Sequence, residues 1–427
     1  MSKNDNTVTV IGAGAAGLLA AWRASALGAR VTVLEKNPKP AIKILISGGG
    51  KCNITNASDF RTMLKQFATA EERFLRYSFH EFTNVQLLEL LRNEGVETYA
   101  RENGKVFPVS HDAEEVVNAL MKMVQRNGVT VRLQTPVKEI FANPDGSYNV
   151  QTNRDIVRSR RVIVATGGAS YQKTGTTGDG YRWLRSLGHS IVQPRPALAP
   201  IMLNPVPPAA WQGTPVRDGA LLAVAEDTVT GAAETAAQWN GDLLITHFGL
   251  SGPAALEVSH HAFVAMEKGK RVTMVIDFFP ERTADQMEEW LRTKIEEHPS
   301  RSLLTLTEQT VPQRLAEFIL VTAGIPFITR LNQITRSQRR TLAMVLKRCP
   351  LGTVTGIPLD RGEVTAGGVS LSEIDPTTMG SKVRPGLFVC GELLDVAGPV
   401  GGYNLQAAFS TGYVAGTSAG TMISQAD

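Results

Sequence analysis

Three glycines near the start of the chain, Gly12, Gly14 and Gly17, are spaced as Gly-x-Gly-x-x-Gly directly after an apolar, β-branched run. In this spacing the first glycine permits a tight turn, the second lets backbone approach a pyrophosphate, and the third lets a helix pack on a strand. Glu35 follows 18 residues after Gly17. A carboxylate there accepts hydrogen bonds from a ribose diol and repels a 2′-phosphate. The pattern therefore predicts a site for FAD or NAD rather than NADP.

Three further clusters favour a flavin. The segment Lys43–Asn56 reads KILISGGGKCNITN, and its successive glycines let backbone lie against a large flat ligand, although an ordinary flexible loop is the alternative. Val164–Gly168 indicates a buried strand that ends in a bare glycine pair. The third cluster is Gly391–Glu392 and Asp395, followed by Gly401–Asn404 at the start of the last helix. An acidic side chain there could hold ribityl hydroxyls, and the helix N-terminus could stabilise negative charge on a reduced flavin.

Three side chains are candidates for a catalytic role, and each has a structural alternative. Cys52 is either an acid that protonates a substrate carbon or a small residue packed beside the cofactor, and packing is favoured. His247 is expected in a strand-to-helix turn facing the cofactor, as a general acid or, preferably, as a hydrogen-bonded structural residue. Tyr403 either bonds substrate or packs. No metal site is expected, because His260 and His261 lack a third ligand.

The elements that must position these residues are recognisable from periodicity. Thr7–Gly12 predicts a strand, Ala15–Leu27 a helix and Ala29–Lys36 a second strand, which together form a βαβ unit and imply a parallel sheet. A β-hairpin is expected with arms at Val137–Phe141 and Tyr148–Thr152. Further buried strands are expected at 161–166 and 387–390, and a final helix at about 404–422.

Composition suggests how the chain divides. Seven prolines fall between residues 193 and 216, and short strand-like runs follow to about 279 before helical patterns take over. The expected domains are a cofactor domain built from 1–192 and 351–427, a β-rich insertion at 193–279, and a helical insertion at 280–350. The chain of 427 residues is long enough for two or three domains.

Charge and cysteine content exclude some classes of protein. The net charge of +4 permits a polyanionic partner without requiring one, and the Arg336–Arg348 and Arg158–Arg161 clusters are interpreted as solvated surface rather than an RNA footprint. Three distant cysteines argue against a disulfide framework or a zinc site and favour a reducing cytoplasm. The sequence contains no run of about 18 apolar residues, so no membrane span is predicted. The oligomeric state is not predicted.

The chain resembles the BaiN/YhiN-like family of FAD-dependent oxidoreductases. The matching stretches run from Val10 to Gly412 and include VIGAGAAGLLAA, KILISGGGKCNITN, ATGGASY, TGTTGDGY, LLITHFGLSGPAAL, TAGGVSLSEID, TMGSK and GELLDVAGPVGGYNLQAAFSTG. One departure is visible, because Ala41–Ile42 precede Lys43 where the family usually has Gly-Arg-Lys. Any contact made by that arginine is absent here or supplied otherwise.

The resemblance implies an α/β fold: a Rossmann-type, glutathione-reductase-like FAD-binding domain with an inserted β-barrel-like domain and a small helical domain. It also implies tightly bound FAD, with Glu35 at the adenosine ribose. The full set of expected cofactor-binding residues is Gly12, Gly14, Ala15, Gly17, Glu35, Lys36, Lys43, Ser47, Gly48, Gly49, Gly50, Lys51, Cys52, Asn53, Val137, Ala165, Thr166, Gly167, Gly391, Glu392, Asp395, Gly401, Gly402, Tyr403 and Asn404.

The expected function is NAD(P)H-driven reduction of an activated carbon–carbon double bond, with hydride passing from flavin N5 to substrate. No second Gly-x-Gly-x-x-Gly follows a strand, so NAD(P)H is expected to dock transiently. The alternatives are a dihydrouridine synthase acting on ribosomal RNA, a flavin amine oxidase using oxygen, and a non-catalytic FAD-binding protein. The expected partner is therefore a small-molecule substrate or ribosomal RNA, with no membrane.

Overall fold

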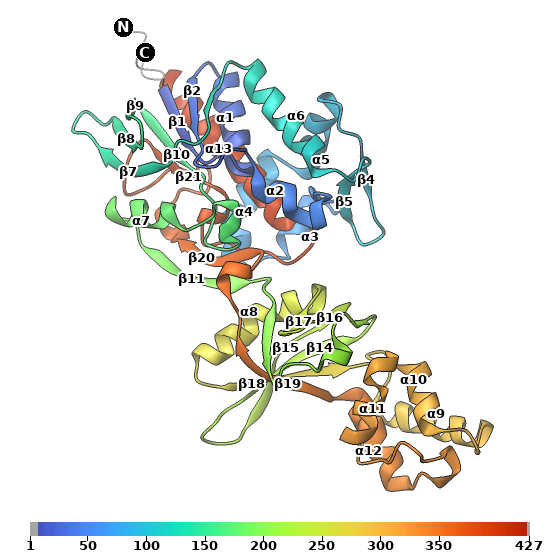
Figure 1. Cartoon of the computed structure of the whole chain (residues 1–427). Coiled ribbons are helices and arrows are strands. Elements are labelled where there is room, and N and C mark those ends of the chain that lie inside the picture. The colour runs from blue at the N-terminus through green and yellow to red at the C-terminus, as the bar shows by residue number, and fades with distance from the viewer. Residues whose placement is uncertain (1–6, 425–427) are drawn as a thin grey trace. The chain divides into compact units, whose positions relative to one another are not determined.

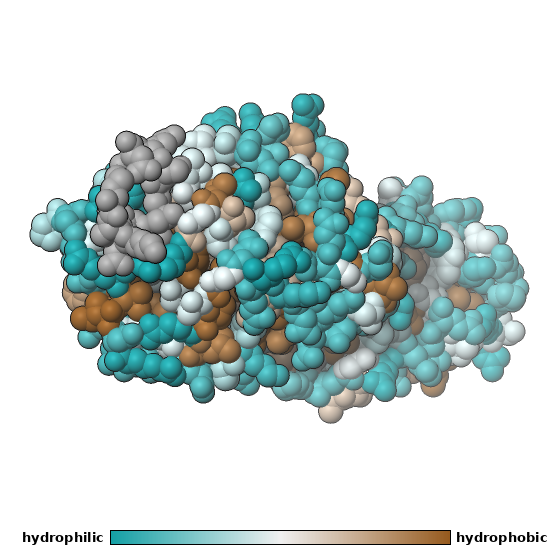
Figure 2. Space-filling model, turned by 90° about the horizontal axis from the view of Figure 1, so that it is seen from above, coloured by the Kyte–Doolittle hydropathy of each residue, from teal (hydrophilic) through white to brown (hydrophobic). Residues whose placement is uncertain are grey.

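A computed structural model describes residues 7–424 of the chain, with side chains up to residue 421. The fold divides into two compact units. The split unit combines residues up to Arg195 with those from Val364 on, and the inserted unit is Pro196–Glu363. Hydrophilic residues cover most of the face seen in Figure 2, and hydrophobic residues show in smaller groups between them. Within residues 7–424, no helix is long and apolar enough to cross a membrane.

The split unit is built on a parallel sheet with strand order β21-β10-β1-β2-β6. These strands are short and rich in buried valine, isoleucine and leucine, as expected where helices cover both faces. The strands are β1 (Thr7–Ile11), β2 (Arg30–Leu34), β6 (Thr130–Arg132), β10 (Arg161–Val164) and β21 (Leu387–Val389). The predicted βαβ unit and Rossmann-type fold class are confirmed.

Helices and two small sheets surround this parallel sheet. The helices are α1 (Ala15–Ala26), α2 (Ile42–Ile46), α3 (Phe60–Leu64), α4 (Thr69–Glu81), α5 (Asn84–Asn93), α6 (Ala113–Arg126), α7 (Asp179–Ser186) and α13 (Tyr403–Ser424). One small sheet joins β3 (Thr55–Asn56), β5 (Lys105–Pro108) and β4 (Thr98–Ala100), and the other joins β7 (Val137–Ala142), β8 (Tyr148–Thr152) and β9 (Ile156–Ser159). The predicted hairpin is therefore present as β7 and β8.

The two parts of the split unit are joined where α13 packs against α1, and Figure 1 shows the red and blue helices side by side. Glycines make this close approach possible. A Cβ added at Gly412 would lie 2.3 Å from the carbonyl oxygen of Ala16, and one at Gly416 would lie 2.4 Å from that of Ala20. Because those neighbours are backbone atoms that cannot move aside cheaply, each position needs glycine.

The inserted unit contains an antiparallel sheet of order β13-β16-β17-β12-β19-β18-β14-β15. Strands β11 (Ile191–Ala197) and β20 (Val364–Val369) pair and carry the chain into and out of this unit. The sheet strands are β12 (Ile201–Asn204), β13 (Pro215–Val216), β14 (Ala220–Glu226), β15 (Ala233–Asn240), β16 (Leu243–Ile245), β17 (Gly249–Ser251), β18 (Arg271–Asp277) and β19 (Cys349–Gly356). The helices are α8 (Pro253–Glu267), α9 (Ala284–Glu297), α10 (Leu303–Thr310), α11 (Gln313–Thr322) and α12 (Arg336–Lys347).

The inserted unit differs from the sequence expectation in two respects. Helix α8 lies in a region where only short strands were expected, because its buried stripe is made mainly of alanine and gives little hydrophobic contrast. Strand β19 pairs with β18 and β12, so the border expected after residue 350 falls after residue 363 instead. Helices α9 to α12 share one hydrophobic core with the sheet and fall in the same compact unit. The expected division of this unit into a β-rich and a helical domain at residue 280 stays a prediction.

Candidate cofactor site

The turn that joins β1 to α1 gives its three glycines different surroundings. Gly12 has a φ of +103°, and a Cβ there would lie 2.5 Å from the carbonyl oxygen of Ala165. A Cβ at Gly17 would lie 1.9 Å from the carbonyl oxygen of Gly12, so this glycine lets the helix pack on the turn. Gly14, by contrast, would meet nothing within 4 Å. The turn therefore leaves open space at Gly14 and the start of α1, where Ala15 lies, as a pyrophosphate site requires.

Glu35 follows β2 and turns its carboxylate towards the same turn. It is 7 % exposed. One oxygen accepts the N–H of Ala13 at 2.8 Å, and the other accepts the N–H of Asn37 at 2.8 Å. These bonds fix the carboxylate beside the β1–α1 turn, which is where the sequence pattern places the ribose. Contact with a ribose stays a prediction.

Two further expected cofactor-binding residues, Lys36 and Val137, differ in their surroundings. The Lys36 ammonium bonds Asp179 of α7 at 2.7 Å and the Thr177 hydroxyl at 2.6 Å, so it already has partners within the protein. Val137 begins β7 two residues after Thr135, whose N–H donates to the Glu35 carbonyl at 2.8 Å. The chain thus brings Val137 close to the Glu35 end of the site.

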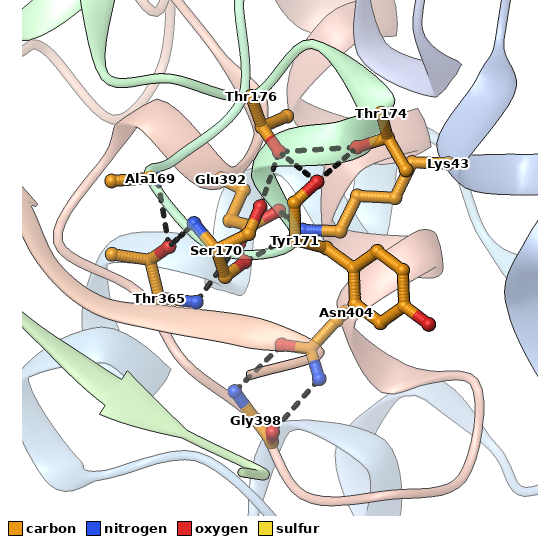
Figure 3. Close-up of polar contacts among 10 residues, drawn as sticks. All are labelled: Lys43, Ala169, Ser170, Tyr171, Thr174, Thr176, Thr365, Glu392, Gly398 and Asn404. Carbon is orange, nitrogen blue, oxygen red and sulfur yellow. Dashed lines mark hydrogen bonds and ion pairs between the residues drawn. The ribbon is translucent and has the colours of Figure 1, made fainter. Parts of the chain in front are cut away.

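A network of polar side chains, here called the Glu392 cluster, joins four distant segments of the split unit (Figure 3). One Glu392 oxygen pairs with the Lys43 ammonium at 2.5 Å, and the other accepts the N–H of Thr365 at 2.9 Å and the Ser170 hydroxyl at 3.0 Å. The Thr365 hydroxyl accepts the N–H groups of Ala169 and Ser170 at 2.9 and 3.0 Å. Glu392 therefore links the segments that carry Lys43, Ser170 and Thr365. Its expected contact with ribityl hydroxyls stays a prediction.

Two hydroxyl groups near this cluster are buried without a hydrogen-bond partner: the Thr166 Oγ1 and the Tyr181 hydroxyl of α7. Tyr181 is 5 % exposed. Its burial and the charges of Glu392 and Asp395 raise the pKa of its hydroxyl, which therefore remains a donor. Buried polar groups are normally satisfied, so these two hydroxyls remain available to a polar ligand. Sequence reasoning missed Tyr181, whose only signal is its place in the TGTTGDGY stretch.

The Ser47–Cys52 loop combines open glycines with a buried thiol. Gly48, Gly49 and Gly50 have φ values of +57°, +70° and +85°, and a Cβ at Gly49 would meet nothing within 4 Å. The Cys52 N–H donates to the Ser47 carbonyl at 3.0 Å, and Cys52 is 1 % exposed. Burial raises the pKa of its thiol to about 12. The thiol is therefore protonated and inaccessible, which favours its packing role.

The same loop is tied to the start of α13. In the amide orientation that satisfies both of its ends, Asn53 donates to the Thr55 carbonyl at 3.1 Å and accepts the N–H of Gly402 at 3.0 Å. A Cβ at Gly402 would lie 2.4 Å from the carbonyl carbon of Thr55, so only glycine fits. Lys51 is exposed at the outside of the loop.

The segment that leads into α13, here called the 395–404 loop and including the first two residues of the helix, is held by an internal clasp. The Asn404 amide accepts the N–H of Gly398 at 2.8 Å and donates to the carbonyls of Gly398 at 2.8 Å and Pro399 at 3.3 Å (Figure 3). The Tyr403 ring is partly buried and lies against Gly401, where a Cβ would come within 2.5 Å of it. The clasp fixes the N-terminal end of α13, whose N–H groups favour negative charge.

The expected cofactor residues all belong to the split unit, where these contacts link their segments. The exception among the catalytic candidates is His247, which lies in the inserted unit. It is exposed in the turn that joins the antiparallel strands β16 and β17. The expectation of a strand-to-helix turn was wrong, because a further strand separates His247 from α8. Its expected place facing the cofactor stays a prediction.

Comparison with known proteins decides the family. The model of the family described as HI0933-like protein Rossmann domain matches residues 6–418. The chain belongs to this family. It is 30 % identical to the 3-dehydro-bile acid delta(4,6)-reductase of Clostridium scindens over 421 residues, covering 97 % of this chain and 99 % of that protein. It is 29 % identical to the ribosomal RNA dihydrouridine synthase of Escherichia coli over 406 residues, covering 95 % of each chain.

A solved structure shares the fold at low sequence identity. The 3-ketosteroid delta1-dehydrogenase of Sterolibacterium denitrificans has a TM-score of 0.53 and 15 % identity, covering 98 % of this chain and all of that one. The family and its relatives identify the chain as an FAD-dependent oxidoreductase. The site fits FAD: Gly14 and Gly49 leave backbone open for close approach, and Thr166 and Tyr181 offer buried hydroxyls that lack partners.

Proposed function

We propose that this enzyme reduces a carbon–carbon double bond conjugated to a carbonyl group of a small molecule, with NAD(P)H as the source of electrons. Its full-length likeness to the Clostridium scindens reductase carries the proposal, since that protein's name specifies double bonds at positions 4 and 6 of a 3-oxo bile acid. Bound FAD would supply the redox chemistry, accepting hydride from NAD(P)H and passing it to the substrate double bond.

The chain's own residues would bind and orient the cofactor. The open backbone at Gly14 and the N-terminal end of α1 suit the pyrophosphate, and the hydroxyls of Thr166 and Tyr181 suit its polar chain. The N-terminal end of α13, fixed by the Asn404 clasp, would face the part of the ring system that gains negative charge.

The proton for the second substrate carbon has one favoured source among the expected candidates of the split unit. Cys52 is buried with a pKa raised to about 12, which suits a general acid poorly. Tyr403 keeps an accessible surface beside Gly401, at the end of the loop that begins α13. We therefore propose Tyr403 as the residue that contacts substrate.

A second candidate substrate is a uridine in ribosomal RNA, because the Escherichia coli relative is named for making dihydrouridine there. That reaction also reduces a double bond next to a carbonyl. The inserted unit gives RNA no electrostatic support, since it has 16 lysines and arginines against 18 aspartates and glutamates. Arg339 and Arg340, part of the arginine cluster seen in the sequence, both pair with Glu288. The positive excess lies in the split unit, with 28 basic against 22 acidic residues.

Anaerobic mixing of the FAD-loaded protein with NADH or NADPH tests the proposal. We expect the visible flavin absorbance to disappear and to return when a 3-oxo steroid with conjugated double bonds is added. Failure of both nicotinamides to bleach the flavin contradicts the proposed reductant. Oxygen-dependent peroxide release with simple amines, and no nicotinamide, would instead identify an amine oxidase.

The substrate itself is decided by a genetic comparison. If the RNA function holds, deletion of the gene removes one dihydrouridine from ribosomal RNA, and the steroid fails to restore the flavin absorbance. If the small-molecule function holds, the dihydrouridine content of the RNA is unchanged by deletion, and the steroid restores the absorbance.

A further inference from the structure

Glu71, in the first turn of α4, reaches across to the 395–404 loop. One of its carboxyl oxygens accepts the N–H of Ala397 at 3.2 Å, and the other accepts the N–H of Ala68 at 3.1 Å. A Cβ at Gly398 would come within 2.7 Å of the Phe67 ring, so the loop also packs closely on the segment before α4. Nothing in the sequence pattern singled out Glu71.

The surroundings of Glu71 oppose its negative charge. Its burial, with a smaller contribution from the charge of Asp395, raises the pKa of its carboxyl group to about 7. The hydrogen bonds from Ala68 and Ala397 act in the opposite direction, because they favour the ionised form. Its neighbour Glu72 is a contrast, since it pairs with Arg76 on the outside of α4 at 3.2 Å.

We propose that Glu71 is a positioning residue for the flavin site, and that its protonation controls how firmly the 395–404 loop is held at the start of α13. The proposal rests on the FAD assignment and extends it to a residue outside the expected site. It assigns Glu71 no contact with substrate or cofactor.

The chemistry of the carboxyl group explains the control. A carboxylate accepts both N–H groups, one on each oxygen. A protonated carboxyl group turns one oxygen into a donor, so either Ala397 or Ala68 loses a full-strength acceptor. The far end of the loop is held by the Asn404 amide, which does not titrate. One end of the loop is therefore fixed, and the other responds to pH.

Hydrogen–deuterium exchange of the apo protein tests the contact without using activity. After correction for the intrinsic effect of pH, we expect peptide 395–404 to exchange about tenfold faster below pH 7 than above it, since a hydrogen bond to a charged group contributes that much. E71Q keeps one acceptor and should show no pH step. E72Q, the matched control on the same turn, should behave like the wild type. A step that persists in E71Q overturns the proposal.

A titration of FAD across the same pH range tests the link to the flavin site. We expect FAD to bind more weakly as the pH falls through 7 in the wild type and in E72Q, and equally at all pH values in E71Q. FAD binding that ignores pH in the wild type overturns the positioning role. If FAD binds none of the proteins, the cofactor assignment fails, and the exchange result still decides whether Glu71 holds the loop.

Discussion

The interiors of the two units differ in kind. In the described part of the chain, the split unit buries 18 polar or charged side chains, whereas the inserted unit buries three, Thr214, Ser259 and Thr307. The core of the inserted unit is otherwise leucine, isoleucine, valine and alanine with a few larger apolar side chains. A polar interior costs stability unless every group is paired, so a unit that carries one must gain something else from it.

The gain is a set of fixed positions around the site. Gln406, which is fully buried, accepts the Thr55 hydroxyl at 2.6 Å and donates to the Phe82 carbonyl at 3.2 Å and the Ser410 hydroxyl at 3.0 Å. Such bonds tie α13 to β3 and to the end of α4 in one geometry. The comparison teaches that preorganisation for a ligand belongs to the split unit, while the inserted unit is organised by apolar packing.

The largest expected effect comes from the helix contact that closes the split unit. In G416A the new Cβ would lie 2.4 Å from the Ala20 carbonyl oxygen, so α13 must move away from α1. We expect a loss of about 3 kcal/mol in the free energy of unfolding, and loss of bound FAD. The matched control is G356A in β19, where the nearest atom to the new Cβ is 3.7 Å away. Equal thermal stability of the two variants would contradict this account.

The next effect concerns pH. The pKa of Glu71 is raised from 4.5 to about 7 in the folded protein, so the folded state binds the proton more tightly than the unfolded state. Release of the loop alone removes the Ala397 hydrogen bond, which favours the ionised carboxylate, whereas global unfolding also ends the burial of Glu71, which favours the protonated form. In global unfolding, the stability that the bound proton provides is therefore complete below pH 4.5 and is lost as the pH rises through 7. The loss amounts to about 3 kcal/mol at most. Denaturant unfolding should show this fall in the free energy of unfolding with rising pH in the wild type and in E72Q but not in E71Q. An equal fall in E71Q would show that Glu71 is not its source.

A smaller effect is expected at the Glu392 cluster. E392Q removes the ion pair with Lys43, which is mostly buried, and weakens the bonds to Ser170 and Thr365. We expect FAD to bind about tenfold to hundredfold more weakly, as loss of hydrogen bonds to a charged group implies. The control is E234Q, which breaks an exposed pair with Lys270 in the inserted unit. If both variants bind FAD like the wild type, the cluster does not shape the site.

The smallest effect is expected at Cys52. Replacing this buried thiol in C52A removes packing and should lower the free energy of unfolding by about 1 kcal/mol. Turnover of the FAD-loaded enzyme should stay within about twofold, because the thiol packs rather than transfers a proton. A fall of about a hundredfold or more, the usual loss on removing a general acid, would restore Cys52 as a catalytic residue.

Sequence reasoning succeeded where the signal is local. The glycine spacing at Gly12–Gly17, the β-branched strands and the alanine-rich final helix each act within a few residues, so the βαβ unit and α13 could be predicted. It failed where the partner is distant. Glu71, Tyr181 and Thr365 acquire their roles from segments brought together by folding, and no spacing rule connects them. His247 was misplaced because a three-residue strand leaves almost no periodic signal.

The glycine contacts of α13 also have a consequence for the order of events at the ribosome. Residues 196–363 are synthesised before α13. The inserted unit therefore has all its core residues available while the split unit still lacks the helix that packs on α1. Because α13 packs closely on α1 and begins at the proposed flavin site, we expect FAD to bind only after this last helix has emerged. A premature stop codon just ahead of Tyr403 would therefore yield a colourless polypeptide whose middle third is nonetheless folded.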